Sequence, residues 1–230
     1  MHGHHGAMQT LAWITDPHLD ALSSVQRATF FESIASSKPE GVVITGDIAE
    51  GEALLPILEA FDTAIEAPIF FVLGNHDYYG GHVERVRQRI RDLCVRGRNL
   101  RWLPSEGVVE LSSKTALVGH GGWSDGRGGD FLASPIRIRD YTEIQDLRDL
   151  APEPLFRALR ALGLQAARAL EPHLEMALEQ YQNILVATHS PPFVEACWYQ
   201  GQAGINEWSP HFTCVAMGEL LDKMAVRYSH

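Results

Sequence analysis

The chain has few cysteines and no long apolar run, and these absences exclude several classes of protein. Only 3 cysteines occur among 230 residues. Their odd number and long spacing fit neither a disulfide framework nor a zinc ribbon. No apolar run approaches the roughly 20 residues that span a bilayer, and the first residues lack the apolar stretch of a signal peptide. We therefore expect a protein of a reducing, cytoplasmic compartment.

Basic residues are also scarce relative to acidic ones. The chain carries 19 Lys and Arg against 29 Asp and Glu, a formal net charge of −10, which argues against a broad nucleic-acid or anionic-membrane surface. An anionic substrate is still compatible with this charge, because bound metal ions can dominate the field within a site. We expect residues 1–8, rich in His and Gly, to be a tag or a disordered arm. Residues 9–230 are expected to form one domain.

Short apolar runs alternate with helical patterns along much of the chain. This alternation predicts a mainly parallel sheet covered by helices, which is an α/β arrangement. The predicted buried strands span residues 11–15, 41–45, 68–73 and 183–187, and the predicted helices span residues 25–35, 53–65, 82–94 and 217–226.

The middle of the chain has a different pattern. Two apolar runs within residues 107–119 predict a hairpin or a meander pair. Residues 121–129 are rich in glycine, have no regular period and predict a long surface loop. Residues 155–181 have a strong helical pattern, although Gly163 and Pro172 are expected to interrupt it.

Four polar clusters each follow a predicted strand directly. They are Thr15-Asp16-Pro17-His18, Gly46-Asp47, Gly74-Asn75-His76-Asp77 and Thr188-His189-Ser190. In an open parallel sheet, ligand sites form at the carboxyl ends of the strands. One edge of the sheet would therefore collect these residues although they span the chain, and this agreement in position is stronger support than any single motif.

The residue types in these clusters suit a metal site with mixed oxygen and nitrogen ligands. Carboxylates supply charge, imidazoles select transition metals, and Asn75 offers an amide oxygen. Asp47 could bridge two metals, since a carboxylate has two oxygens with lone pairs to spare. Each cluster also has a purely structural interpretation: a turn for those at Asp16 and Asn75, a helix N-cap for Asp47 and a backbone contact for His189.

Together, the four clusters resemble the signature of the calcineurin-like metallophosphoesterases. The matching motifs are Asp16-x-His18, Gly46-Asp47, Gly74-Asn75-His76-Asp77 and a later lone His189. The first two are weak alone, the third is strong, and all four in this order are highly specific. The resemblance implies a layered α/β (α+β) fold, in which a two-sheet β-sandwich is flanked by helices.

The resemblance also implies a dinuclear metal centre with a role for each residue. The implied ligands are Asp16 and His18 at the first ion, Asp47 between both ions, and Asn75 and His189 at the second. His76 would instead be catalytic, facing the substrate as a general acid or charge stabiliser, and Glu50 is the candidate that orients it. Two divalent ions (Mn, Fe or Zn, with Mg as an alternative) would support hydrolysis of a phosphomonoester or phosphodiester by a metal-bridged hydroxide.

One motif expected from this resemblance is missing. Such proteins usually carry Gly-His-x-His a few dozen residues after the lone histidine, where it completes both metal sites, whereas this sequence stops at His230 without it. We therefore expect a domain that is incomplete at its C-terminus. The alternative function is a catalytically impaired or silent family member that acts as a binding scaffold. Trp123, Trp198 and Trp208 either wall a substrate pocket or pin loops to the core.

Overall fold

The first sheet of the computed structural model has four parallel strands in sequence order. The structure describes residues 7–199, 201–203 and 207–227, so most of the predicted arm lies outside the described residues. The strands are β1 (Leu11–Ile14), β2 (Gly41–Thr45), β3 (Ile69–Val72) and β4 (Leu100–Trp102). The first three match the predicted strands. β4 is an addition, and its three residues are too few for a periodic pattern to be recognised.

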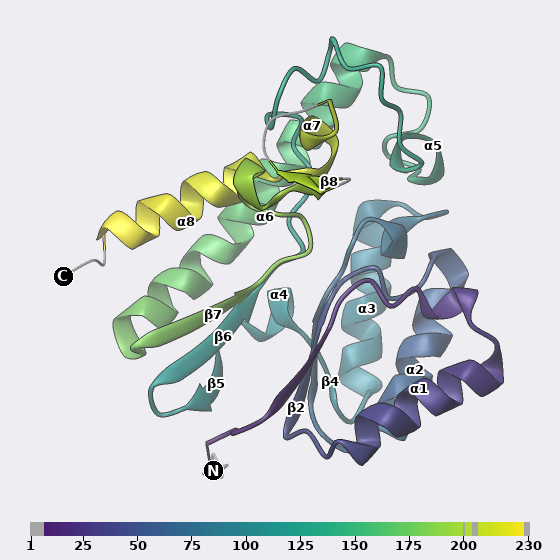
Figure 1. The fold of residues 1–230 in the computed structure, drawn as a ribbon, viewed down its shortest axis with the longest axis vertical. Helices are drawn as coiled ribbons and strands as arrows, with labels where there is room; N and C mark the ends of the chain where they lie inside the picture. Colours follow the sequence, from purple (N-terminus) through teal and green to yellow (C-terminus); the bar gives the residue numbers. More distant parts are fainter. Residues whose placement is uncertain (1–6, 200, 204–206, 228–230) are drawn as a thin grey trace.

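Three helices cover one face of this sheet. They are α1 (Ser24–Ser36), α2 (Leu54–Ala64) and α3 (Val83–Arg96), on the right in Figure 1. All three agree with the predicted helices to within two residues at each end. Ser23 begins α1 with a capping box, in which its side chain and that of Gln26 each accept from the other's backbone N–H. The buried stripe of α2, which includes Leu54, Leu58 and Phe61, packs into the main core.

A second sheet packs against the other face of the first. Its strands are β5 (Val109–Ser112), β6 (Thr115–Gly119) and β7 (Asn183–Ala187). β5 and β6 form the predicted antiparallel hairpin, and β7 pairs with β6 in parallel. The core between the sheets includes Phe70, Val72, Leu111 and Leu117. Helices α6 (Pro152–Gln180) and α8 (Val215–Arg227) cover the outer face of the second sheet, so the predicted two-sheet sandwich flanked by helices is confirmed (Figure 1).

Helix α6 is continuous, so the predicted interruptions at Gly163 and Pro172 are wrong. Pro172 has no N–H to donate to the carbonyl of Arg168, and both residues are exposed. Water can satisfy that carbonyl, and tertiary packing of the helix outweighs the local cost. Gly163 is buried, and a Cβ built there would lie 2.6 Å from the Asp125 Cβ. The glycine therefore permits close packing and does not break the helix.

The glycine-rich segment is not the surface loop that its composition predicts. Residues 121–126 are all buried. Trp123 packs against Tyr78 with ring centroids 5.2 Å apart. The buried Asp125 carboxylate accepts a hydrogen bond from the backbone N–H of Ala216, near the start of α8. Glycine here serves close approach between buried backbones, which composition alone does not distinguish from a flexible loop.

The remaining elements are short. They are α4 (Leu103–Glu106), α5 (Asp140–Glu143), α7 (Ser209–Phe212), β8 (Trp198–Tyr199), β9 (Gln202–Ala203) and the 3-10 turns η1 (Leu19–Ala21), η2 (Gly51–Ala53), η3 (His76–Tyr78) and η4 (Val194–Ala196). Several of them lie above the carboxyl ends of the strands in Figure 1, with α5 and α7 uppermost. This covering layer comes from segments that the sequence left without assigned structure.

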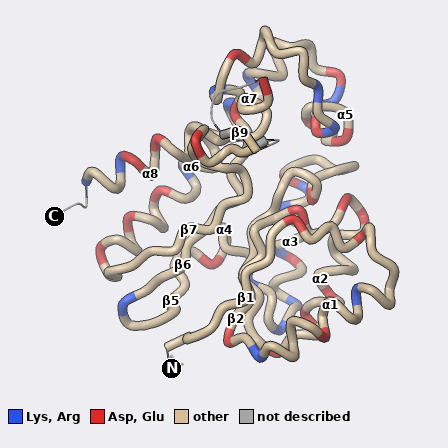
Figure 2. The backbone as a smooth tube through the Cα atoms, in the orientation of Figure 1, with Lys and Arg blue, Asp and Glu red and all other residues tan. Residues whose placement is uncertain are grey.

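The outermost strands and the distribution of charge complete the description. β1 and β7 were predicted as buried strands, yet each lies at a sheet edge, and Trp13 and Leu185 are exposed there. Acidic and basic residues are interspersed along the helices in Figure 2 and do not gather into one basic stripe. Among the described helices, none combines the length and apolar character needed to cross a membrane.

Candidate metal centre

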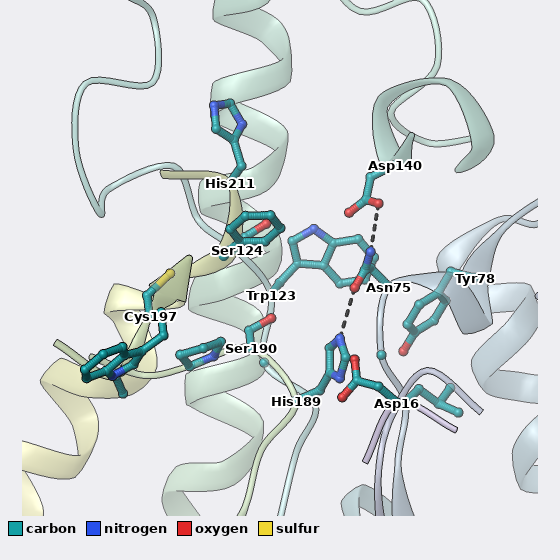
Figure 3. A pocket seen from close by; sticks show the side chains of 17 residues that line it. Asp16, Asn75, Tyr78, Trp123, Ser124, Asp140, His189, Ser190, Cys197 and His211 are labelled. Carbon is teal, nitrogen blue, oxygen red and sulfur yellow. Dashed lines mark hydrogen bonds between the residues drawn. The ribbon is translucent and has the colours of Figure 1, made fainter. Parts of the chain in front are cut away.

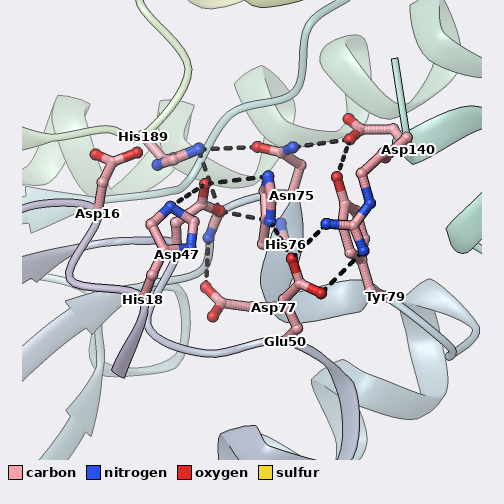
Figure 4. Close-up of polar contacts among 12 residues, drawn as sticks. Asp16, His18, Asp47, Glu50, Asn75, His76, Asp77, Tyr79, Asp140 and His189 are labelled. Atoms are coloured by element: carbon pink, nitrogen blue, oxygen red, sulfur yellow. Dashed lines mark hydrogen bonds and ion pairs between the residues drawn. The ribbon is translucent and has the colours of Figure 1, made fainter. Parts of the chain in front are cut away.

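The carboxyl ends of four strands bring the predicted site residues together (Figure 4). These residues are Asp16 and His18 after β1, Asp47 after β2, Asn75 and His76 after β3, and His189 after β7. Ligand atoms from two sets of three residues, His18 with Asp47 and His76, and Asp16 with Asp47 and His189, each lie within 4.8 Å of one another. Residues far apart in sequence thus form one cluster, and Asp47 belongs to both sets.

The backbone at this edge is held in an uncommon conformation. Of the five non-glycine residues with positive φ in the described chain, three are predicted ligands: Asp16 (50°), His18 (40°) and Asp47 (52°). The left-handed region costs a residue with a side chain about 1 kcal/mol or more. Such strain clusters at functional sites, where the surrounding structure holds it. β1 and β2 therefore each end in a sharp turn that directs a ligand side chain toward the common edge.

Two glycines allow these turns to pack against one another. Gly46 has a φ of 97°, and a Cβ there would lie 2.7 Å from His189 Nδ1 and 2.6 Å from the backbone nitrogen of Gly74. A Cβ on Gly74 would collide with the Asp47 carboxylate and lie 2.8 Å from His189 Cε1. Both positions need glycine because the loops after β2, β3 and β7 meet without room for a methyl group.

Asp47 divides its two oxygens between the two sets. Its Oδ1 accepts the backbone N–H of His76 at 3.0 Å and lies 3.5 Å from His189 Nε2. Its Oδ2 lies 3.8 Å from His18 Nε2 and 3.9 Å from His76 Nε2. The side chain is buried at 6% exposure. This is the arrangement that a bridging carboxylate requires.

His189 Nε2 and the amide oxygen of Asn75 face each other. His189 Nδ1 lies 2.9 Å from the Thr45 carbonyl oxygen, which can only accept, so Nδ1 carries a proton. Asn75 Nδ2 donates to Asp140 Oδ1 at 2.8 Å, which leaves the amide oxygen facing His189 Nε2 at 3.0 Å. With Asp47 Oδ1 beside them, these acceptors need a positive charge between them. Either a proton on Nε2 or a bound cation supplies it, and the donor set fits a divalent metal.

Two predicted ligands of one ion fall in different sets of ligand atoms. The resemblance pairs Asp16 with His18 at one ion, whereas the ligand atoms of Asp16 group with His189 and those of His18 group with His76. His76 was predicted to lie outside the metal ligands, yet its ring is in edge contact with that of His18, with centroids 4.9 Å apart.

Glu50 lies beside His76, the residue that it was predicted to orient. Glu50 Oε1 lies 2.9 Å from His76 Nδ1. Arg139 donates to both oxygens of Glu50, at 2.8 and 3.0 Å. These hydrogen bonds, first from Arg139 and then from His76, lower the pKa of Glu50 against the effect of burial. Glu50 is thus ionised at neutral pH and can stabilise a protonated His76 ring.

Sequence reasoning missed Asp140 and the role of Asp77. Asp140 is buried and accepts both Asn75 Nδ2 and the Tyr79 hydroxyl at 2.7 Å. Burial raises the pKa of Asp140, and these two hydrogen bonds oppose the rise. Asp77 accepts the backbone N–H groups of Ile48, Ala49 and Gly74, and so joins the loops after β2 and β3. No sequence motif marks Asp140, because it lies 65 residues from Asn75.

A cavity of about 390 Å³ opens beside the candidate ligands (Figure 3). Asp16, Asn75 and His189 line it on the strand side. Its other walls are largely aromatic or apolar, and include Tyr78, Trp123, Pro191, Cys197, Trp198 and Phe212. Among the described residues that line it, none is Lys or Arg. Trp123 and Trp198 thus wall the cavity, while Trp208 stacks on Phe212 with ring centroids 5.7 Å apart.

Comparison with protein families agrees with this geometry. The family model described as calcineurin-like phosphoesterase matches residues 10–218. The chain belongs to the calcineurin-like phosphoesterase family. It is therefore a hydrolase of the phosphoesterase type, and its strand-end cluster provides candidate ligands for the divalent metals that this family binds.

A solved structure supports the fold independently. The crystal structure of phosphopantetheinyl hydrolase from Mycobacterium tuberculosis is similar, with a TM-score of 0.62 over 91% of this chain and 77% of that chain. The two sequences are 17% identical, so this likeness concerns the fold alone. No curated protein sequence matches the chain.

Proposed function

We propose that this phosphoesterase hydrolyses a phosphomonoester or phosphodiester with two divalent metal ions held at the strand ends. The observation that carries the proposal is the meeting of three potential ligand atoms, in which Asn75 Oδ1 and Asp47 Oδ1 lie 3.0 and 3.5 Å from His189 Nε2. Mn, Fe or Zn suits these mixed ligands best, and Mg is the alternative. The three cysteines are free thiols, which supports the expected reducing, cytoplasmic setting.

The chain's own residues have distinct tasks in this proposal. Asp16, His18, Asp47, Asn75 and His189 would hold the ions. Bound ions would polarise the phosphoryl oxygens and make water a nucleophile near neutral pH. His76 would donate a proton to the leaving oxygen, a step that typically contributes about 10²- to 10⁴-fold. Glu50 stabilises the protonated ring through its contact at Nδ1, which leaves Nε2 for the substrate.

We place the organic part of the substrate in the adjoining cavity. Its volume of about 390 Å³ is within the range of small-molecule sites. Aromatic walls favour a planar or apolar group. Among the described residues that line the cavity none is Lys or Arg, so a second phosphate on the leaving group would find no cationic side chain there. The preferred substrate thus has one phosphoester and an uncharged leaving group.

Substitution of Asp47 tests the proposal at its centre. The purified chain would be assayed with 4-nitrophenyl phosphate and bis(4-nitrophenyl) phosphate, in chelator and then with Mn²⁺ or Zn²⁺. Metal-dependent turnover is expected, and Asp47→Asn should lower kcat/KM by about 10³-fold or more, since it removes the shared ligand. Asp92→Asn, on the exposed side of α3, is the matched control. Turnover that is unaffected by chelator, or that persists in Asp47→Asn, would contradict the proposal. Metal binding without any turnover would favour the alternative function, a binding scaffold.

His76→Gln separates an acid from a ligand. If His76 donates the proton, the variant keeps its metal content while hydrolysis of phenyl phosphate falls far more than that of the nitrophenyl ester, whose leaving group needs no proton. If His76 is a ligand, metal content measured by elemental analysis falls and both substrates suffer alike. The second result would overturn the role assigned here to His76.

A further inference from the structure

Two consecutive residues at the start of α5 contact both functional parts of the site. Asp140 holds the amide of Asn75, and Arg139 holds the carboxylate of Glu50. We propose that Arg139 and Asp140 are positioning residues: Asp140 aims the Asn75 oxygen at the metal, and Arg139 fixes the Glu50–His76 pair. We call these two residues the clamp. The inference rests on the proposed function, but its two halves have separate readouts.

The first half of the proposal concerns Asp140, which determines whether the oxygen or the NH₂ group of the Asn75 side chain faces the metal. An Asn side chain offers an oxygen on one side and an NH₂ group on the other. Asp140 Oδ1 accepts from Asn75 Nδ2 at 2.8 Å, so only the oxygen can face His189. Asp140 is 3% exposed, and Tyr79 donates to the same oxygen at 2.7 Å. Without this acceptor the amide could turn its NH₂ group toward the cation, which it cannot bind.

The second half of the proposal concerns Arg139, which holds both oxygens of the Glu50 carboxylate. The guanidinium meets Glu50 through two parallel hydrogen bonds of 2.8 and 3.0 Å, a geometry that Lys cannot reproduce. Glu50 Oε1 is shared between Arg139 and His76 Nδ1. Arg139 therefore determines where the carboxylate lies, and through it the orientation of the His76 ring, without contacting the ring's free nitrogen.

Tyr79 joins the two halves into one unit. Its hydroxyl donates to Asp140, and the Arg139 Cζ lies 5.0 Å from its ring centroid. The Tyr79 ring also packs against His76, with centroids 4.4 Å apart. Tyr79 therefore packs beside both halves, while each clamp residue keeps its own hydrogen bonds to the site.

The clamp side chains are not needed to anchor the segment that carries them. Backbone hydrogen bonds already tie it down: Gly80 N–H donates to the Glu143 carbonyl at 2.8 Å, and Gln145 N–H donates to the Gly81 carbonyl at 3.0 Å. Asp146 adds a bond from the Val83 N–H at 2.7 Å. Since these contacts do not involve Arg139 or Asp140, a role in the site explains the two side chains better than a role in folding.

Metal titration of the apoprotein tests the Asp140 half without an activity assay. Asp140→Ala should weaken Zn²⁺ or Mn²⁺ affinity, measured by calorimetry, by about 10- to 100-fold. Asp140→Asn can keep an acceptor oxygen at the same place, so its affinity should stay within a few-fold of the unmodified protein. Unchanged affinity in Asp140→Ala, or equal losses in both variants, would overturn the orienting role.

Leaving-group dependence tests the Arg139 half. Arg139→Gln should keep its metal affinity but lose about 10- to 100-fold in kcat on phenyl phosphate and little on 4-nitrophenyl phosphate. Arg139→Lys should recover part of the loss. The control is Arg89→Gln, because Arg89 makes an equivalent two-bond pair with Glu52 on the surface. Equal losses on both substrates would show a merely structural role. If the unmodified protein is inactive, the proposed function fails while the metal titration still decides the Asp140 half.

Discussion

The loops after β1, β2 and β3 and the covering layer, which consists of the described residues within 121–151 and 190–214, are built in opposite ways. In the loops, each functional residue lies directly after its own strand, and glycine or positive φ makes the turn. In the covering layer, the decisive contacts join residues far apart in sequence. Asp140 reaches Asn75 across 65 positions, and His211 reaches Tyr141 across 70. The loops supply the chemistry, and the covering layer positions it and encloses the cavity.

This difference shows where the two regions are vulnerable. A substitution in a strand-end loop should damage the site directly, because the side chains or backbones of several loops meet there. A substitution in the covering layer outside the clamp should act first on stability, because the buried polar residues there are held by long-range hydrogen bonds. The predictions that follow test this contrast, beginning with the largest effect.

Gly74→Ala should abolish the site with a single methyl group. The added Cβ would collide with the Asp47 carboxylate and approach His189, so metal affinity measured by calorimetry should fall by about 100-fold or more. Gly80→Ala is the control, because its φ is 74° but nothing lies within 4 Å of its Cβ position. It should cost only about 1 kcal/mol of stability and leave metal binding intact. Similar metal affinities for the two variants would remove the contrast.

Gly163→Ala sets helix propensity against packing. Propensity alone predicts a gain of about 1 kcal/mol in α6. The added Cβ would lie 2.6 Å from the Asp125 Cβ, and such overpacking typically costs about 1–3 kcal/mol. We expect a net loss in denaturant unfolding, with metal affinity nearly unchanged. Leu164→Ala, at an exposed neighbouring position, is the control for the helix. A stabilised Gly163→Ala variant would show that the covering layer is less tightly packed than described.

Mild acid should loosen the covering layer through His211. Burial and the nearby Arg137 lower the pKa of His211 to about 4, below its ordinary value of 6.5. The unfolded chain therefore takes up a proton below pH 6.5 while the folded chain does not, so stability is lost as pH falls from 6.5 toward 4. At pH 5 the loss from this group is about 2 kcal/mol. His211→Gln should shrink the difference in unfolding free energy between pH 7 and pH 5 by that amount, and an unchanged difference would refute the assignment.

The strand-end part of the site could be predicted from sequence because its information is local. The clusters at Asp16, Asp47 and Asn75 each follow an apolar run directly, and parallel strands necessarily bring their ends to one edge. The structure places these residues together with His18, His76 and His189, as predicted. The first three strands, the helices over the first sheet and the hairpin were also predictable from periodicity, whereas the two-sheet sandwich was implied by the family resemblance.

The rest of the molecule could not be predicted, because there the information is spread over residues that are far apart in sequence. Arg139 and Asp140 stand in a stretch without a period, and nothing near them in sequence marks their partners. The burial of residues 121–126 depends on the distant Tyr78 and α8, and composition suggested a surface loop. Gly163 similarly has a partner in Asp125 that only the folded chain reveals.

His189 follows a strand of the second sheet, whereas the other candidate ligands follow strands of the first. Cations bound there would cross-link the two halves of the sandwich, adding to the contact between His189 and the Thr45 carbonyl. Resistance to unfolding would then depend on metal supply, gaining about 2.7 kcal/mol when the free ion stands at one hundred times its dissociation constant. In this protein the availability of an ion would govern how firmly the sheets stay docked as well as how fast the reaction runs.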